Sequence, residues 1–283
     1  MSRVAAVVGL GLIGGSIARD LAARGLRVLG HDSNAAALGR AVEAGVVAGT
    51  LGDDLERIAG VDWLVLAAPV DAATVLLERV RPHLAGVRLV TDTGSTKRRI
   101  VAAAEALDMG ATFVGSHPFT GDHRAGWDAS RQGLFDDCRV FLCRTRDTTD
   151  AALGEAESLW SLCGARTRAI DAAAHDALLA RTSHLPQVLS SALSAALAAA
   201  DVPAGETGRG ARGMLRLAGS DPAVWTPIAL HNADNLAEAL QSVEGALAAL
   251  RGALETGDRA AVEAVFRAGA EYAGRIATQA AAT

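Results

Sequence analysis

The chain has 283 residues, half of them hydrophobic, and carries a formal net charge of −5 at neutral pH. This length and apolar content allow a sizeable core in one large or two medium domains. The acidic balance, with no block of basic residues, argues against nucleic acid or an anionic membrane surface as a partner.

The first 170 residues alternate between apolar runs and helical stretches. Short apolar runs of β-strand character occur at 4–8, 27–30, 63–67, 88–91, 112–115, 139–143 and 166–170. Helical stretches separate most of these runs, for example at 16–24, 71–80 and 97–107. Such alternation predicts an α/β fold, a Rossmann-type doubly wound parallel sheet over residues 1–170.

Residues 171–283 carry only helical signals, because Ala and Leu dominate and β-branched runs disappear. The expected helices are 172–181, 186–200, 227–254 and 259–277, with a loop or broken segment at 202–213. The run 188–200 is too short to span a bilayer and too apolar to stay exposed in a monomer. We therefore expect an all-helical domain that dimerises and closes a substrate cleft at the carboxyl ends of the strands.

A glycine-rich segment directly follows the first predicted strand. Gly9, Gly11 and Gly14 form a G-x-G-x-x-G motif before a helix, and Asp32 follows the second strand. In this context the glycines allow a tight turn, close approach of a pyrophosphate, and close helix–strand packing. Asp32 would bind the ribose of NAD and repel the 2′-phosphate of NADP, so NAD is the expected cofactor. The other expected cofactor-binding residues are Leu12, Ile13, Ala68 and Pro69.

Two further strand ends carry side chains suited to dehydrogenase chemistry. Ser95 or Thr96 can cap a helix starting at Lys97, and the N-terminus of that helix would then favour an anionic substrate. His117, followed by Pro118, is placed to accept a proton, because imidazole titrates near neutral pH. Lys97 is the only lysine among 27 basic residues, which raises the question of a function for it.

The cysteines indicate neither a metal site nor a disulfide framework. Cys138, Cys143 and Cys163 are odd in number and fit no metal-ligand spacing. We expect reduced, partly buried thiols in a cytoplasmic protein that needs no metal.

Five motifs occur in an order that resembles the prephenate/arogenate (cyclohexadienyl) dehydrogenases of tyrosine biosynthesis. They are Gly9-x-Gly-x-x-Gly-Gly-Ser16, Asp92-x-Gly-Ser-x-Lys97, Gly115-Ser-His-Pro118, Ser183-His-Leu-Pro186 and Ser220-Asp-Pro222 with Trp225. The resemblance implies a Rossmann domain and a helical domain that dimerises by interlocking helices. It also implies NAD-dependent oxidative decarboxylation of prephenate to 4-hydroxyphenylpyruvate and CO2.

The same resemblance implies roles for individual residues. His117 matches the catalytic histidine, and Ser95 matches the serine that supports it. Arg216 matches the arginine that binds a substrate carboxylate. The residues that match positions in the substrate pocket are His184, Gln187 and Trp225.

The chain departs from the family pattern at positions that would set specificity. Some relatives have a second histidine where this chain has Gln187, and many have an acidic residue at the position of His123, which here follows Asp122. The substrate is therefore open between prephenate, arogenate, both of these in a dual-specificity cyclohexadienyl dehydrogenase, and an amino-substituted prephenate. The polar connection 119–137, with Arg124 and Arg131, is either a lid or a surface loop.

Two other functions are compatible with a dinucleotide fold. A β-hydroxyacid or 6-phosphogluconate-type dehydrogenase would use a lysine from the helical domain, but this chain has no lysine after Lys97. A non-catalytic NAD-dependent sensor would need the glycine motif but would not need His117, Ser95 and Arg216 together.

Overall fold

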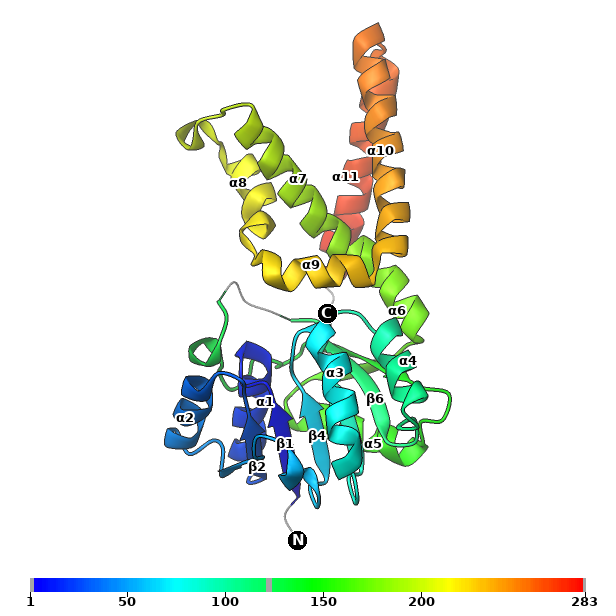
Figure 1. Ribbon diagram of the computed structural model, residues 1–283. Helices are drawn as coiled ribbons and strands as arrows, with labels where there is room; N and C mark the ends of the chain where they lie inside the picture. Colours follow the sequence, from blue (N-terminus) through cyan, green and yellow to red (C-terminus); the bar gives the residue numbers. More distant parts are fainter. Residues whose placement is uncertain (1–2, 121–123, 282–283) are drawn as a thin grey trace. The chain divides into compact units, whose positions relative to one another are not determined.

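The computed structural model describes residues 3–120 and 124–281, and Figure 1 labels its helices and strands. Backbone contacts divide the chain into two compact units, Met1–Ala233 and Asp234–Thr283. The first unit contains the whole sheet and every residue that the sequence suggests for chemistry.

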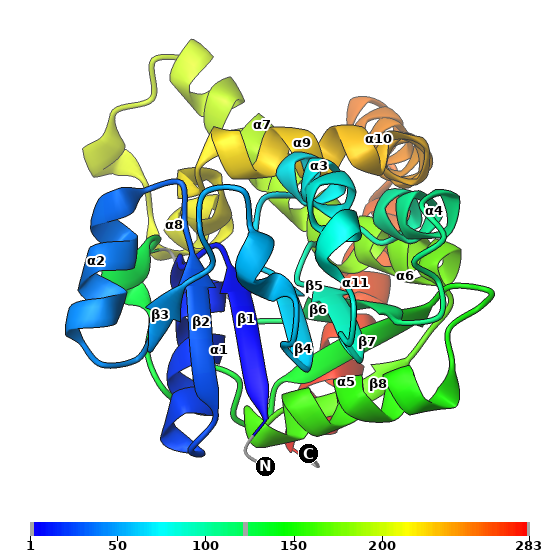
Figure 2. The same ribbon diagram turned by 60° about the horizontal axis from the view of Figure 1, so that its bottom comes forward.

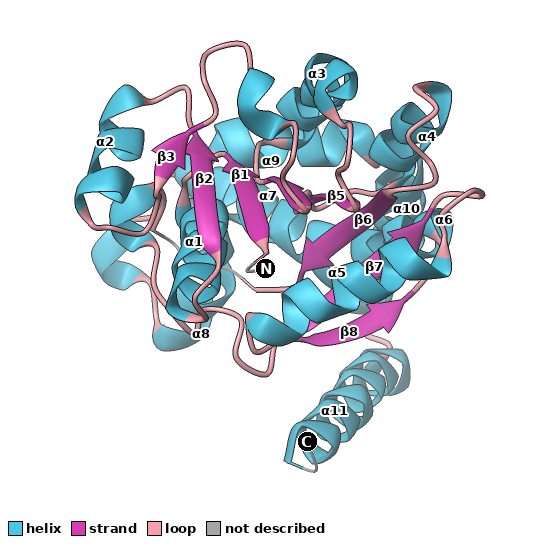
Figure 3. Cartoon of the chain, turned by 90° about the horizontal axis from the view of Figure 1, so that it is seen from below, coloured by secondary structure: helices cyan, strands magenta, loops and turns pink. Residues whose placement is uncertain are grey.

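One eight-stranded sheet forms the centre of the first unit, in the order β3-β2-β1-β4-β5-β6-β7-β8 (Figures 2 and 3). The strands are β1 Val4–Val8, β2 Arg27–His31, β3 Gly49–Thr50, β4 Trp63–Leu66, β5 Leu89–Asp92, β6 Phe113–Pro118, β7 Arg139–Arg144 and β8 Arg166–Ala169. The expected Rossmann-type sheet is thus confirmed. The sequence did not indicate β3, because two residues are too few to show an alternating pattern.

One pair of strands departs from the expected parallel arrangement. β7 runs antiparallel to β6, with His117 opposite Phe141, while all other neighbouring strands are parallel. A parallel crossover needs a long connection, usually an α-helix. The described part of the β6–β7 connection contains only the 3₁₀ turn Trp127–Ala129, so the chain returns antiparallel.

Helices cover both faces of the sheet because its strands are apolar on both sides. In β1, Ala5 and Val7 belong to one buried cluster, and Ala6 and Val8 belong to another. The first cluster includes residues of α1 Leu12–Ala23, α2 Ala35–Glu43 and α5 Asp150–Leu162. The second includes residues of α3 Val70–Val80 and α4 Arg98–Ala106. A buried parallel sheet is expected to show such continuous apolar strands.

The rest of the described chain is helical, as expected. Its helices are α6 Ala172–Leu179, α7 Leu185–Ala199, α8 Arg209–Leu215, α9 Pro222–His231, α10 Ala233–Thr256 and α11 Arg259–Ala281. The predicted boundary near residue 170 follows the last strand directly. The division by contacts lies at Ala233 instead, because α6 packs on α4 and α9 packs on α3.

Three helical expectations need correction. The helix expected at 172–181 ends at Leu179 and continues as a π-helical turn, Ala180–His184. The single helix expected at 227–254 is two helices, because Asn232 breaks the chain between α9 and α10 and is itself buried. The segment expected as a loop at 202–213 includes most of α8, whose last turn is fixed when Ser190 on α7 donates to the Met214 carbonyl.

All three cysteines are free thiols, and Cys143 and Cys163 are buried. Burial raises the pKa of Cys143 to about 12 and that of Cys138 to about 11. Among the described helices, none combines the length and the apolar character required to cross a bilayer.

Candidate functional site

The glycine motif forms a tight turn between β1 and α1. Gly9 has a φ of +91°, and a Cβ atom there would lie 2.2 Å from the Ala67 carbonyl oxygen. A Cβ atom on Gly14 would lie 1.9 Å from the Gly9 carbonyl oxygen, so both positions require glycine. Gly11 faces open space instead, and as the N-cap of α1 it makes no side-chain cap. The first amide groups of α1 thus remain available for an anionic group.

Two adjoining cavities lie around this turn and share Gly11, Ala67, Ala68 and Pro69. One has a volume of about 580 Å³ and is also lined by Gly9 and Asp32. The other has a volume of about 420 Å³ and reaches Ser95 and, on α9, Val224 and Ile228. Of the residues expected to bind the cofactor, only Gly14 does not line either cavity, since it lies beneath the turn.

Asp32 holds the turn as well as lining the first cavity. Its Oδ2 accepts a hydrogen bond of 2.6 Å from the Leu10 amide, and its Oδ1 accepts one of 2.7 Å from the Asn34 amide. The carboxylate is therefore fixed at the carboxyl end of β2, where its remaining lone pairs can accept from a ribose.

The expectation that Ser95 or Thr96 caps α4 is wrong. Lys97 is the N-cap and no side chain of the preceding turn caps the helix. Asp176 on α6 does so instead, accepting from the amides of Lys97 at 2.8 Å and Arg98 at 3.0 Å. This carboxylate already occupies the positive end of α4, so the helix N-terminus is not available to an anionic substrate.

A buried ion pair connects the segment of Ser95 with that of His117. Lys97 is completely buried, and its Nζ binds the Asp92 carboxylate and donates at 2.7 Å to the Ser116 carbonyl. Asp92 also accepts from the amides of Gly94 and Ser116, at 2.8 and 3.2 Å. The only lysine thus fixes the ends of β5 and β6, each next to a residue expected to do chemistry.

A chain of three hydrogen-bonded side chains ends at His117. The Nδ1 atom of His117 lies 2.9 Å from Nε2 of His175, and Nδ1 of His175 lies 2.8 Å from Oδ1 of Asp176. His175 and Asp176 are fully buried, and His117 is 6% exposed. Phe119 and Phe141 pack against the His117 ring from the side of β6 and β7.

The pKa values of Asp176, His175 and His117 determine where the protons of these three hydrogen-bonded side chains lie. Burial raises the pKa of Asp176, but the hydrogen bonds from His175 and from the Arg98 and Lys97 amides outweigh it, so the pKa is lowered. Burial, together with the positive charge of Lys97, lowers the pKa of His175, and the bond to Asp176 only partly opposes this. Burial, then His175, Lys97 and His184, lower the pKa of His117 well below its ordinary value.

These values give one consistent arrangement at neutral pH. Asp176 is a carboxylate and can only accept, so the neutral His175 carries its proton on Nδ1. Its Nε2 then accepts from the Nδ1–H of His117. The neutral His117 is left with a lone pair on Nε2, which is the form of a general base.

His184 lies near this chain on the π-helical turn. Its Nδ1 is 3.1 Å from Nδ2 of Asn232, and its ring stands edge-to-face with Trp225, the centroids 6.1 Å apart. The structure thus brings His184 and Trp225 together, as expected for residues of one pocket. Whether they contact substrate stays a prediction.

Gln187 and Arg216 are placed differently. Gln187 is buried, donates at 2.7 Å to the Leu217 carbonyl and accepts from Ser220 at 3.4 Å. Its amide therefore holds the 3₁₀ turn Arg216–Gly219 on α7. Arg216 begins that turn, is exposed, and lines neither cavity around the glycine turn. A substrate role for either residue stays a prediction.

The connection between β6 and β7 is anchored over much of its length. Arg19 of α1 lies 4.1 Å from the Trp127 ring centroid and donates to Ser130. Ser16 and Asp20 of α1 accept from the amides of Arg131 and Gly133. This part is a fixed surface loop, while Arg124–Gly126 line the second cavity. Asp122 and His123 lie outside the described residues.

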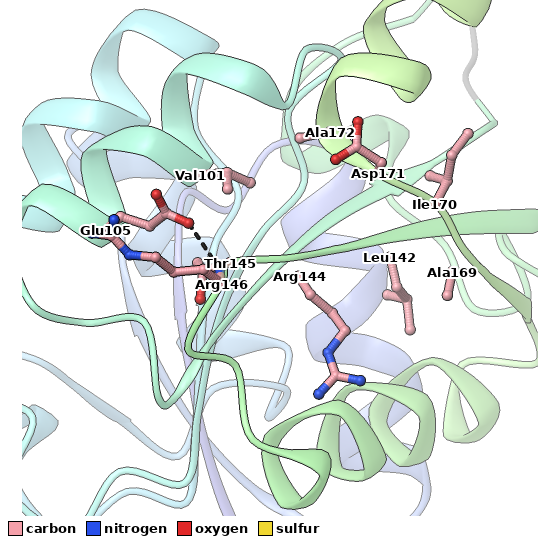
Figure 4. A pocket seen from close by; sticks show the side chains of 10 residues that line it. All are labelled: Val101, Glu105, Leu142, Arg144, Thr145, Arg146, Ala169, Ile170, Asp171 and Ala172. Atoms are coloured by element: carbon pink, nitrogen blue, oxygen red, sulfur yellow. Dashed lines mark hydrogen bonds between the residues drawn. The ribbon is translucent and has the colours of Figure 1, made fainter.

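A separate cavity of about 630 Å³ is lined by none of the expected residues (Figure 4). The guanidinium groups of its two arginines already have acidic partners. Arg144 donates to the Thr148 carbonyl and to Asp150, and Arg146 Nε donates to Asp147 at 3.4 Å. That the chemistry takes place around Ser95 and His117 stays a prediction.

The sequence did not indicate His175, Asp176 and Asn232. The dipeptide His175-Asp176 lies inside an ordinary helical pattern, and Asn232 lies within a run that looked continuous. The one signal was Asn232 itself, because asparagine is unfavourable inside helices.

Two family models match almost the whole chain. Residues 17–169 match the model described as prephenate dehydrogenase, nucleotide-binding domain, and residues 171–268 match prephenate dehydrogenase, dimerization domain. The chain belongs to the prephenate dehydrogenase family.

Individual relatives agree with this family. The chain is similar to a cyclohexadienyl dehydrogenase of Zymomonas mobilis, 30% identical over 89% of this chain and 89% of that protein. It is 29% identical to a prephenate dehydrogenase of Bacillus subtilis over 81% of this chain, and spans 64% of that protein's length. A crystal structure of A. aeolicus prephenate dehydrogenase with hydroxyphenyl propionate and NAD+ has a TM-score of 0.88 and 26% identity, covering 96% of this chain and 98% of that one.

Proposed function

We propose that this member of the family catalyses the NAD-dependent oxidative decarboxylation of prephenate to 4-hydroxyphenylpyruvate, CO2 and NADH. The observation that carries the proposal is the chain Asp176–His175–His117, which leaves His117 with a lone pair on Nε2 at the end of β6. A dehydrogenase needs such a base to take the hydroxyl proton as hydride leaves the same carbon.

The cofactor site fits NAD. The open space above Gly11, the uncapped start of α1 and the fixed carboxylate of Asp32 suit a pyrophosphate and an unphosphorylated ribose. The solved relative with NAD+ supports the same cofactor. When bound, NAD supplies the hydride acceptor.

The chain's own residues handle the proton. His117 Nε2 accepts the proton of the ring hydroxyl as that carbon becomes a carbonyl. The ring carboxylate then leaves as CO2, and the electron pair of the broken C–C bond aromatises the ring. The former carbonyl oxygen becomes a phenol by taking the proton back from His117, so the protein ends unchanged.

The direct test measures absorbance at 340 nm with NAD and each candidate substrate. We expect turnover with prephenate. Turnover with arogenate alone would assign arogenate as the substrate, a choice for which Gln187 and His123 stand at family specificity positions. No NADH from either substrate would contradict the proposal and favour the NAD-dependent sensor.

Cofactor preference should depend on Asp32. Asp32→Asn keeps the size of the side chain but removes the charge that binds ribose and repels a 2′-phosphate. We expect the ratio of kcat/KM for NAD to that for NADP to fall by roughly 10–100-fold, since hydrogen bonds to charged groups contribute about 1.5–3 kcal/mol. Asp54→Asn, at an exposed aspartate that does not line the cavity of Asp32, is the matched control. A wild-type preference for NADP would contradict the assignment.

Arg216 is proposed to bind a substrate carboxylate. Its position on an exposed turn, fixed to α7 by Gln187 and Ser190, leaves its guanidinium accessible. Arg216→Gln should raise KM for prephenate roughly 30-fold or more, about 2 kcal/mol, with little change in KM for NAD. Arg209→Gln and Arg212→Gln are the controls. If one of these loses substrate affinity and Arg216→Gln does not, the assignment belongs to that residue.

The protein is also proposed to be a homodimer. Beyond Ser190, the helix α7 is half-exposed or exposed, and large apolar side chains are also exposed on α8, α9, α10 and α11. They include Met214, Leu230, Leu247, Leu254, Phe266 and Tyr272. Such apolar exposure and the match to a dimerization-domain model support a second copy as the partner. Sedimentation at micromolar concentration should give a dimer, and a 28.9 kDa species would refute it.

A further inference from the structure

The ring of His184 has one nitrogen atom without a partner. The side chain is 1% exposed, and among the described residues nothing makes a hydrogen bond to its Nε2. A buried polar atom of this kind is unfavourable, and in native structures it calls for an explanation.

Asn232 determines which nitrogen of His184 carries the proton. The Asn232 Oδ1 accepts from Nη2 of Arg98 at 3.3 Å, which fixes the orientation of the amide. Its Nδ2 therefore faces the Asp176 carbonyl oxygen at 2.7 Å and Nδ1 of His184 at 3.1 Å. Since the amide nitrogen can only donate, Nδ1 of His184 is the acceptor.

The remaining proton of His184 must then lie on Nε2. Burial lowers the pKa of His184 to about 4, so the ring is neutral at neutral pH and carries one proton. The unpartnered atom is thus a buried N–H donor on a ring that stands edge-to-face with Trp225. An N–H group there lacks an acceptor until a ligand brings one.

We propose that Asn232 is a positioning residue that holds His184 as an Nε2–H donor for an oxygen acceptor of the substrate. This rests on the proposed function and adds the direction of one hydrogen bond to it. The acceptor is a keto or a carboxylate oxygen. An ammonium group would present donors only and cannot take this bond.

The variant Asn232→Asp tests the proposal with almost no change in volume. A carboxylate at this position can only accept, so the His184 proton moves to Nδ1 and Nε2 becomes an acceptor. We expect KM for prephenate to rise roughly 10–100-fold, with a smaller change in kcat and none in KM for NAD. Gln241→Glu, the same amide-to-acid change on the exposed surface of α10, should behave like wild type.

A second variant separates the tautomer from structural damage. The side-chain amide of His184→Gln can place an N–H donor near the position of Nε2, whatever residue 232 is. Introducing it into Asn232→Asp should recover part of the prephenate affinity. If the double variant binds prephenate as weakly as Asn232→Asp alone, the proposal is overturned, because the loss of affinity would then not come from the His184 proton.

The comparison of substrates identifies the acceptor. If Asn232→Asp raises KM equally for prephenate and arogenate, the acceptor is a carboxylate, which both substrates contain. A loss confined to prephenate indicates the keto oxygen, which arogenate replaces with an amino group. Unchanged KM values for both would overturn the proposal.

The tautomer can also be read without turnover, by ¹⁵N NMR of the full-length protein labelled at histidine. The wild type should show His184 protonated at Nε2, and Asn232→Asp should show it protonated at Nδ1. Wild-type protonation at Nδ1 would overturn the inference. An inactive wild type with His184 protonated at Nε2 would instead contradict the proposed function alone.

Discussion

Replacing His117 with Asn should lower kcat by roughly 10²–10⁴-fold, the usual contribution of a general base. Asparagine keeps a polar side chain that can donate to His175 but offers no lone pair of comparable basicity. KM for NAD should change little, because His117 lines neither cavity around the glycine turn. His83→Asn, a partly exposed histidine beyond α3, is the control.

The pH dependence adds a second measurement of the same base. Burial, and then electrostatic interactions with His175, Lys97 and His184, lower the pKa of His117 well below 6.5. The neutral, proton-accepting form therefore persists into mildly acidic solution. The acidic limb of wild-type kcat/KM should lie below pH 6.5 and should disappear in His117→Asn. Near-normal kcat in that variant would place the base elsewhere, with His184 and His123 as the next candidates.

Asp176→Asn should lower kcat by a similar factor, roughly 10²–10⁴-fold, without removing any group that takes part in proton transfer. The carboxylate accepts from His175, from the Lys97 amide and from the Arg98 amide. An asparagine has one acceptor oxygen and an NH2 group, so it cannot satisfy all of them. If the NH2 group faces His175, both histidines change tautomer and His117 Nε2 becomes protonated. Loss of a tautomer-fixing aspartate has such an effect in the serine protease triad.

The stability difference between Asp176→Asn and the wild type should depend on pH in a defined direction. The pKa of Asp176 is lowered in the folded protein, because the bonds from His175 and the two amides outweigh burial. Its ionisation therefore stabilises the fold above the ordinary aspartate pKa, and this stabilisation is lost as pH falls through the lowered value. Asp176→Asn should unfold more easily at pH 7, with a difference from wild type that shrinks in acid. Loss of the α4 cap alone contributes about 1 kcal/mol.

Asp171→Asn is the matched control for both measurements, because the Asp171 side chain caps α6 by accepting from the Ala173 and Ala174 amides. Its only bond to His175 is between backbone atoms, and the substitution keeps that bond. It should lose some stability and keep its kcat. If Asp176→Asn also kept its kcat, the orientation of His117 would not depend on the carboxylate.

Local patterns were enough to predict seven of the eight strands, the glycine turn and the position of His117. Each depends on neighbours within a few residues: apolar runs mark the strands, and the turn requires Gly9 and Gly14 whatever lies elsewhere. A histidine before a proline at the end of a strand is visible in the same way.

The partners of His117 could not be read from the sequence, because they are distant along the chain. Asp176 caps a helix 78 residues earlier, and His175 bonds to a side chain 58 residues earlier. By local rules, Ser95 or Thr96 could cap α4. In the folded protein the Asp176 carboxylate accepts from the first amides of that helix instead. Likewise, Asn232 ends α9 where its amide reaches the Asp176 carbonyl, a contact that no helical periodicity reveals.

The burial of Lys97 should make the folded protein unreactive toward reagents that modify lysine side chains. It is the only lysine of the sequence and none of it is exposed. Acylating dyes and aldehyde crosslinkers should therefore find no lysine on the folded surface. Any modification of this amine reports that the ends of β5 and β6 have separated, and its rate, read by mass spectrometry, measures how often the floor of the site opens.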